Sequence, residues 1–227
     1  MRAGDALIGP VRSPRVTHDG PKTSLLSYGI AQLYLAAFGW KTEGDLPPLN
    51  KAIFIAAPHT SAWDAPFMLA VAWSYRMKMS WIAKHTLLEG FRGPLMRWLG
   101  AVPIDRRAAL GQVAQVVARI TESDGMFLAI APEGTRGQTE HWKSGFYRMA
   151  EGAKVPIVCG FLDYKRKVGG LGPVFIPSGD VAKDMERLRE FYKEVSGYRP
   201  EQFAQPRLRE ELEASGASTA VGSAKSS

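Results

Sequence analysis

KAIFIAAPHTSAWDAP, Lys51 to Pro66, is the stretch of the chain that decides the fold. Its first half is apolar without polar alternation, which predicts a fully buried strand over residues 51–57. Pro66 suits the first turn of a helix, so a helix is expected to follow. Between the strand and the helix stand His59 and Asp64. The stretch therefore predicts a buried strand, a polar turn at its mouth and then a helix.

Outward from this stretch, apolar strands alternate with helical patterns. The pattern predicts strands at residues 51–57, 79–84, 101–105, 126–131, 155–162 and 173–177, and helices at about 65–75, 87–99, 108–122, 145–152 and 184–195. Aliphatic strands that are spaced by helices favour an α/β fold, here a single domain with a mostly parallel, helix-covered β-sheet. In such folds the chemistry gathers in the loops at the strand ends.

The chain divides into four predicted segments. Residues 1–22 are expected to be a loose N-terminus, 23–48 an amphipathic, membrane-associating helical segment, 49–210 the main domain and 211–227 a disordered tail. The 16 residues from Leu25 to Trp40 are fewer than the roughly 20 that a membrane-spanning helix needs. This segment is therefore expected either to lie on one leaflet as a helix or to pack on the core.

Composition and charge limit the functional classes. Of the 227 residues, 45% are hydrophobic and 22% are charged, as in globular proteins. A net charge of +7 attracts polyanions such as nucleic acid, anionic lipid or phosphorylated substrates, and charge alone does not choose among them. No basic run resembles a nucleic-acid arm, so we expect no nucleic-acid partner. The single cysteine, Cys159, excludes a disulfide within the chain and is expected to be a buried, small apolar residue.

His59 and Asp64 are candidates for acid–base chemistry. Their spacing does not place them on one face of a helix, but in a turn the carboxylate can fold back onto the imidazole. Asp64 would then fix the tautomer, which leaves the other ring nitrogen free as a general base. The alternative is structural, with Asp64 as a helix N-cap and His59 as a hydrogen-bonded core residue. No second His or Cys lies nearby at ligand spacing, so no metal is expected.

Two further loops carry arginines. PEGTRG, Pro132 to Gly137, offers exposed N–H groups and a guanidinium that suits an anion, although a surface turn with a Glu–Arg ion pair is the alternative. In the first case Glu133 would bind a hydroxyl or orient the arginine. GAVPIDRR, Gly100 to Arg107, places one acidic residue and two arginines after a short strand. The start of a charged helix would also explain this pattern.

In this order, the blocks His59-x4-Asp64, Gly100–Arg106, Pro132–Arg136 and Val155–Val158 resemble the glycerolipid acyltransferase family over about residues 50–165. The resemblance makes residues 49–210 an acyltransferase domain and implies that His59 is the general base and Asp64 its orienting partner. It also implies that Arg106 and Arg136 bind the acceptor phosphate, in a pocket shaped by Glu133, Gly134 and Thr135.

The activity implied by the resemblance is transfer of a fatty acyl group from acyl-CoA or acyl carrier protein to a hydroxyl of a lysophospholipid. The most favoured acceptor is 1-acyl-sn-glycerol-3-phosphate. No cofactor beyond the acyl thioester co-substrate is expected. The protein is expected to be peripheral or monotopic on the cytoplasmic face of the cell membrane.

Several alternatives stay open at this point. Pro58, Ala131 and Cys159-Gly160 depart from the usual motifs, which leaves the acceptor and the acyl chain undetermined. The same chemistry could act on another lysolipid, an amino-acid lipid or a glycolipid, or the protein could bind lipid without catalysis. A serine hydrolase is disfavoured because no Gly-x-Ser-x-Gly elbow surrounds Ser61.

Overall fold

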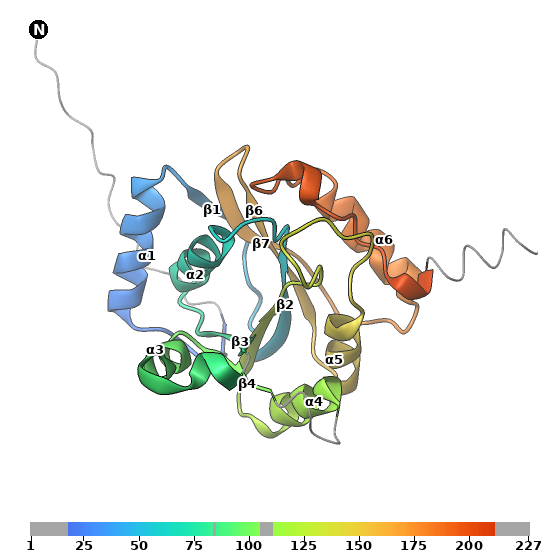
Figure 1. Ribbon diagram of the computed structural model, residues 1–227, viewed down its shortest axis with the longest axis horizontal. Helices are drawn as coiled ribbons and strands as arrows, with labels where there is room; N and C mark the ends of the chain where they lie inside the picture. Colours follow the sequence, from blue (N-terminus) through green and yellow to red (C-terminus); the bar gives the residue numbers. More distant parts are fainter. Residues whose placement is uncertain (1–17, 84, 105–110, 212–227) are drawn as a thin grey trace, which may run out of the picture.

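A seven-stranded sheet runs through residues 18–83, 85–104 and 111–211, which are the residues that the computed structural model describes (Figure 1). The strand order is β1-β7-β6-β2-β5-β3-β4. Neighbouring strands are parallel except β6 and β7. The strands are β1 (Lys41–Glu43), β2 (Lys51–Ala57), β3 (Met79–Ala83), β4 (Ala101–Pro103), β5 (Met126–Ile130), β6 (Ile157–Asp163) and β7 (Val168–Phe175).

Helices cover both faces of the sheet (Figure 1). They are α1 (Leu25–Ala37), α2 (Asp64–Ser74), α3 (Gly93–Trp98), α4 (Gln112–Glu122), α5 (Gly145–Ala153) and α6 (Val181–Tyr192). Alternate residues of the central strand β2 pack into the helical layers on the two faces of the sheet, because successive side chains of a strand point to opposite faces. Ile53 and Ile55 join the core under α4, α5 and α6, whereas Ala52 and Phe54 join the core under α2. Burial on both faces explains why β2 is apolar throughout.

The predicted fold class is confirmed as a single α/β domain with a mostly parallel sheet flanked by helices. The predicted β2, β3, β5 and α2 match the observed elements to within one or two residues. The sheet differs from the prediction at one edge, where β7 begins at Val168 instead of residue 173 and β1 was not predicted. A Cβ atom on Gly170 would lie 2.0 Å from the carbonyl oxygen of Glu43, so glycine permits β1 to approach.

The segment predicted as 23–48 contains the 13-residue helix α1 and then strand β1, so it is not helical throughout. The inner side of α1 packs through Ala31 and Leu35 on Phe67 and Val71 of α2. Its outer side carries apolar side chains that remain exposed. Among the residues the structure describes, none of the helices has the length and hydrophobicity needed to cross a membrane. Packing on the core is therefore observed for one side of α1, and membrane contact by the other side stays a prediction.

The two predicted flexible ends lie largely outside the described residues, which exclude 1–17 and 212–227. Residues 18–22 were expected to be loose but are packed. His18 is buried, its Nε2 atom lies 3.2 Å from the carbonyl oxygen of Tyr75, and Lys22 forms a β-bridge with Met77. The observed domain therefore begins before α1.

The C-terminal segment, defined as residues 196–211, crosses the carboxyl ends of the central strands. The backbone N–H of Trp142 donates to the carbonyl oxygen of Arg207 at 2.7 Å. The indole N–H of the same residue donates to the carbonyl oxygen of Ala204 at 3.0 Å. These bonds bind the segment to the long loop between β5 and α5. The segment itself follows α6 and is drawn in red at the upper right in Figure 1. The segment thereby reaches the loops that carry the predicted motifs.

Candidate active site

Sheet topology brings the two main motifs together. Strands β2 and β5 are parallel neighbours, with Ile55 paired to Ile130, so both end at the same edge of the sheet. The loop after β2 carries His59 and the loop after β5 carries Glu133 to Arg136. Side chains that are more than seventy residues apart in sequence therefore share one site, at the carboxyl edge where α/β enzymes bind ligands.

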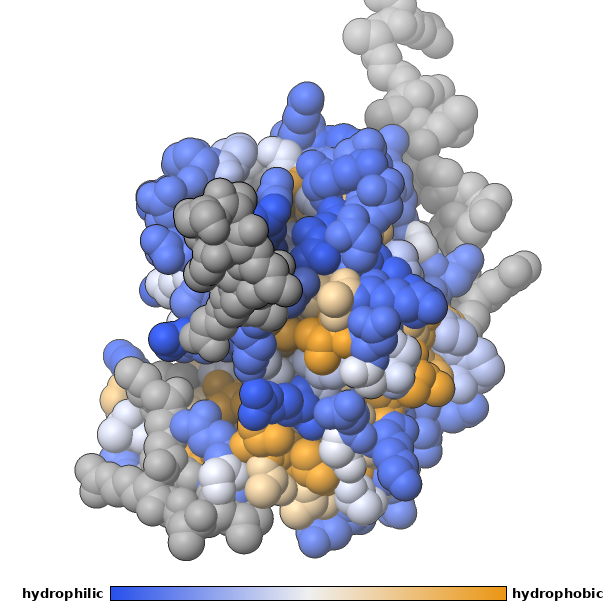
Figure 2. Space-filling view, turned by 90° about the vertical axis from the view of Figure 1, so that its right-hand side faces the viewer, coloured by the Kyte–Doolittle hydropathy of each residue, from blue (hydrophilic) through white to orange (hydrophobic). Residues whose placement is uncertain are grey.

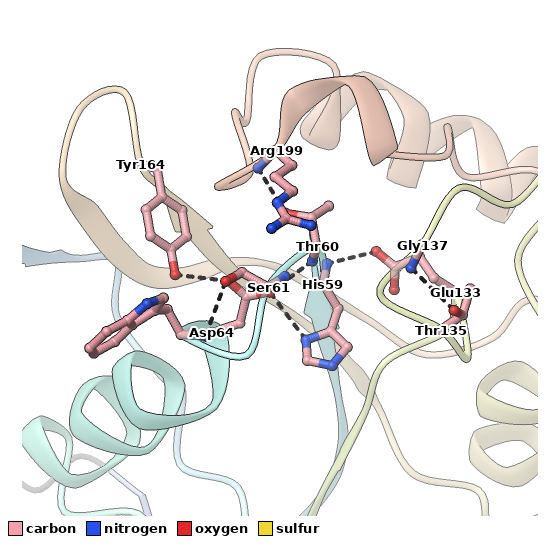
Figure 3. A network of polar contacts seen from close by, with 10 residues as sticks. His59, Thr60, Ser61, Asp64, Glu133, Thr135, Gly137, Tyr164 and Arg199 are labelled. Atoms are coloured by element: carbon pink, nitrogen blue, oxygen red, sulfur yellow. Dashed lines mark hydrogen bonds and ion pairs between the residues drawn. The ribbon is translucent and has the colours of Figure 1, made fainter.

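Asp64 is the most completely held side chain of the site. It is the first residue of α2 and is 0% exposed. Its Oδ2 atom accepts the backbone N–H groups of Thr60 at 2.7 Å and Ser61 at 2.8 Å, and its Oδ1 atom accepts the hydroxyl of Tyr164 at 2.8 Å (Figure 3). The carboxylate thus folds back over the preceding turn. It does not act as an N-cap for the helix, which was the structural alternative.

The imidazole of His59 lies beside this carboxylate. Its Nδ1 atom is 3.2 Å from Oδ2 of Asp64, and 25% of the side chain is exposed (Figure 3). The contact has the distance of an ion pair but lacks the alignment of a hydrogen bond, so Nδ1 has no hydrogen-bond partner among the described residues. If the pair is catalytic, a long or poorly aligned contact is expected before substrate binds. The geometry directs Nδ1 at the acid and leaves Nε2 as the nitrogen that can accept a proton.

Glu133 supports the backbone of the histidine. Its Oε1 atom accepts the N–H of His59 at 3.0 Å, whereas its Oε2 atom has no partner among the described residues. The side chain is 3% exposed, and burial raises its pKa to about 7. The sequence suggested that Glu133 binds a hydroxyl or orients Arg136. The structure places it against the His59 loop instead, and no ion pair between Glu133 and Arg136 is present in the described structure.

A cleft of about 450 Å³ opens beside the His–Asp loop. Its walls include Thr60 to Trp63 on one side and Arg136 and Gly137 on the other. Gly134 and Thr135 are exposed in the same loop as Arg136. The hydroxyl of Thr135 accepts the N–H of Gly137 at 3.1 Å, which holds the turn. The predicted phosphate-binding loop therefore borders a cleft, while Arg106 lies outside the described residues.

Sequence reasoning missed the residues that later parts of the chain bring to the site. Tyr164, which follows β6, donates to Asp64. Tyr198, Arg199 and Gln202 of the C-terminal segment also line the cleft. Only long-range contacts place them there, so no local pattern in the sequence could have indicated them.

Two other predictions concern metals and the cysteine. Within the described ranges, no group of three or more His, Cys, Asp or Glu residues could hold a metal ion. Cys159 is buried, as predicted, and burial raises the pKa of its thiol to about 12. The thiol therefore stays protonated and is unsuited to nucleophilic attack.

An imidazole beside a buried carboxylate, at the carboxyl edge of a mostly parallel sheet and next to a cleft lined by two arginines, forms the candidate site of an α/β enzyme. Residues 41–160 match the protein-family model described as Acyltransferase, and the chain therefore belongs to the acyltransferase family. This match confirms the family that the order of the motifs predicted. No curated protein matches the chain. A similar solved structure is PlsC from Thermotoga maritima, described as a 1-acyl-sn-glycerophosphate (LPA) acyltransferase, with 16% identity, a TM-score of 0.48 and coverage of 75% of each chain.

The first prediction concerns Tyr164 as a positioning residue. Tyr164→Phe removes the hydrogen bond to Oδ1 of Asp64 and leaves the buried carboxylate one partner short. We expect kcat to fall by about tenfold, the equivalent of about 1.4 kcal/mol in barrier height, and the pH profile of kcat to shift. The measurement is thiol release from an acyl thioester between pH 5 and 9. An unchanged rate with an unchanged pH profile would contradict a positioning role.

The second prediction concerns the burial of Glu133. The pKa of Glu133 is raised in the folded state. The contribution of its protonated side chain to the free energy of unfolding is therefore complete below about pH 4.5 and is lost as the pH rises through about 7. Glu133→Gln keeps a neutral acceptor for the N–H of His59. The variant should therefore gain stability over the wild type at pH 8 by on the order of 3 kcal/mol and should lose that advantage at pH 4. Urea midpoints at several pH values provide the measurement.

The matched control for this experiment is Glu140→Gln, because Glu140 is an exposed acid in the same loop. Its stability should follow that of the wild type at every pH. If the Glu133→Gln and wild-type curves run parallel, Glu133 does not titrate in this range.

Proposed function

We propose that this acyltransferase moves a fatty acyl group from an acyl thioester to a hydroxyl of a phosphorylated lysolipid, namely 1-acyl-sn-glycerol-3-phosphate. The observation that carries the proposal is the His59–Asp64 contact beside a cleft bordered by Arg136. A buried acid that faces one imidazole nitrogen favours a base at the other nitrogen. A guanidinium at the cleft suits a phosphate on the acceptor.

The proposed reaction is a direct acyl transfer. Nε2 of His59 accepts the proton of the acceptor hydroxyl while the oxygen attacks the thioester carbonyl. A C–O bond forms, the C–S bond breaks, and the imidazolium returns its proton to the departing thiolate. Asp64 stabilises the imidazolium during this step. The carrier thiol is that of coenzyme A or acyl carrier protein, and no further cofactor is required.

The surroundings of the cleft support an acceptor with an apolar tail. Trp63 lines the cleft and is 51% exposed. Its ring centroid lies 6.4 Å from that of Phe38, which follows the last turn of α1. An apolar path therefore leads from the cleft to α1. Such a path suits a lysolipid better than a small polar alcohol.

A membrane surface is the proposed source of that lipid. We define the apolar face as the exposed large side chains on and next to α1 and α3, namely Leu25, Leu26, Ile30, Leu33, Phe91, Leu95 and Trp98. Both helices lie on the α2 side of the sheet (Figure 1), and Trp98 contacts Trp73 of α2 with ring centroids 5.6 Å apart. Exposed Arg92 and Arg97 flank the apolar side chains of α3. The combination suits an anionic leaflet.

The opposite side of the molecule differs in character. The face over α4, α5 and α6 is mainly hydrophilic, with apolar residues gathered near its centre and lower part (Figure 2). This asymmetry supports binding through the α1–α3 side. Together with the net charge of +7, it favours a peripheral or monotopic protein on the cytoplasmic face of the cell membrane.

The third prediction tests the base. His59→Ala removes the proton acceptor, and we expect turnover to fall by at least about 100-fold with the fold retained. Thiol release from palmitoyl-coenzyme A with lysophosphatidic acid measures turnover, and circular dichroism measures folding. Glycolipid and amino-acid-lipid acceptors in the same assay identify the acceptor class.

His141→Ala is the matched control, because His141 lies outside the cleft and is expected to leave turnover unchanged. Turnover by His59→Ala within threefold of the wild type would contradict the general-base mechanism. Tight thioester binding by the wild type without transfer to any acceptor would instead favour a lipid-binding protein that lacks catalysis.

The fourth prediction tests the apolar face. The double variant Leu26→Glu/Leu33→Glu places two charges on the outer side of α1, where the wild-type side chains are 73% and 74% exposed. We expect at least about tenfold weaker binding to anionic vesicles, because each leucine contributes about 1.5–3 kcal/mol when it is buried in lipid. Flotation with anionic and neutral vesicles provides the measurement. The control is Ile176→Glu, which charges an apolar residue that is 67% exposed outside this face. Equal flotation of all three proteins would exclude α1 as the contact.

A further inference from the structure

The cleft beside the His–Asp loop holds two cationic side chains and is bordered by no described acid. Arg136 comes from the loop after β5, and Arg199 comes from the C-terminal segment. The other described residues of the lining are neutral. Neither guanidinium forms an ion pair with a described carboxylate, although six other arginine–carboxylate contacts occur in the same structure. Two unpaired positive charges that border one cavity create a site for an anion.

The segment that supplies Arg199 is fixed to both motif loops. The backbone N–H of Arg199 donates to the hydroxyl oxygen of Thr60 at 3.1 Å (Figure 3). With its amide nitrogen turned toward the loops, Gln202 donates to the carbonyl oxygens of Arg136 at 2.8 Å and Thr60 at 3.3 Å. The position of Arg199 is therefore set by the same loop that carries His59.

A second group of contacts fixes the start of this segment. The N–H of Tyr164 donates to the carbonyl oxygen of Ser196 at 2.8 Å, and the rings of Tyr164 and Tyr198 meet edge to face with centroids 5.2 Å apart. Gly197 allows the close approach, because a Cβ atom there would lie 3.0 Å from both Pro58 and Thr60. A segment held at this many points presents Arg199 with little further cost in backbone conformational entropy.

We propose that Arg199 is a second anion-binding residue of the acceptor site and acts with Arg136 on the headgroup of a phosphate monoester. This inference rests on the proposed acyl transfer to a lysolipid and specifies its acceptor. A phosphate monoester carries close to two negative charges at neutral pH and offers three acceptor oxygens, which suits two guanidinium groups. A carboxylate needs only one guanidinium, and a sugar needs neither. Trp63 and Tyr198 supply aromatic walls for the uncharged part of the acceptor.

The fifth prediction is tested by direct binding. The probe is 1-hexanoyl-glycerol 3-phosphate, a soluble short-chain lysolipid, titrated into the full-length protein by calorimetry. Arg199→Gln should raise Kd by at least about tenfold, the scale of losing one charge-assisted hydrogen-bonding partner. Arg136→Gln should do the same. Arg119→Gln is the matched control, because it removes an exposed arginine of α4 outside the cleft, and it should bind as the wild type does.

Further ligands identify the source of the phosphate. Uncharged 1-hexanoylglycerol should bind weakly and with the same Kd in the wild type and in Arg199→Gln. Glycerol 3-phosphate and inorganic phosphate should bind more weakly than the lysolipid. If either of these binds as tightly as the lysolipid, the site recognises a small phosphate compound without an acyl chain and the lysolipid proposal is overturned. If Arg199→Gln binds the lysolipid as tightly as Arg119→Gln does, Arg199 takes no part in the site.

A turnover measurement distinguishes a failure of this inference from a failure of the proposed function. Thiol release from an acyl thioester is followed with the same proteins and the same lysolipid. Arg199→Gln should raise the acceptor KM more than the thioester KM. Lysolipid binding that depends on Arg199, without transfer by the wild type, would refute acyl transfer and keep the anion site. Wild-type-like transfer and binding by Arg199→Gln would refute the role of Arg199 in the anion site and keep acyl transfer.

Discussion

A carboxylate without any solvent contact organises the site. Burying a carboxylate costs several kcal/mol unless hydrogen bonds compensate for it, and Asp64 receives three such bonds from separate parts of the fold. Two are backbone N–H groups of the preceding turn, and the third is the hydroxyl of Tyr164 after β6. Once these partners are in place, the turn between β2 and α2 has little freedom left. The position of His59 follows from that turn.

The rest of the site depends on strand order. Because β5 and β6 flank β2 as parallel neighbours, the segments that follow all three strands begin at one edge of the sheet. The loop after β5 brings Glu133 under the backbone of His59, and the segment after β6 brings Tyr164 to Asp64. The buried strands therefore contribute to the site by fixing where these loops start, and the loops supply the chemistry.

Much of this arrangement is predictable from the sequence. Continuous apolar runs mark β2, β5 and β6, and the polar residues that follow two of them mark the site. The strands β7 and β1 at one edge of the sheet are harder to predict from the sequence. Strand β7 begins with Val168-Gly169-Gly170, which resembles a loop, and β1 has only three residues. Tyr164 and Arg199 could not be predicted, because their roles depend on contacts with residues 100 and 139 positions away. Glu133 was recognised as part of the site, but its contact with the His59 backbone required the strand pairing.

The place of the C-terminal segment in the chain order has a consequence for biosynthesis. Every strand of the described sheet, and every motif of the family match, emerges from the ribosome before residue 196. The segment that supplies Tyr198, Arg199 and Gln202 to the cleft is therefore translated after every strand of the described sheet. A message cut short in this region would yield a chain that keeps the residues of the family match and lacks one wall of the cleft.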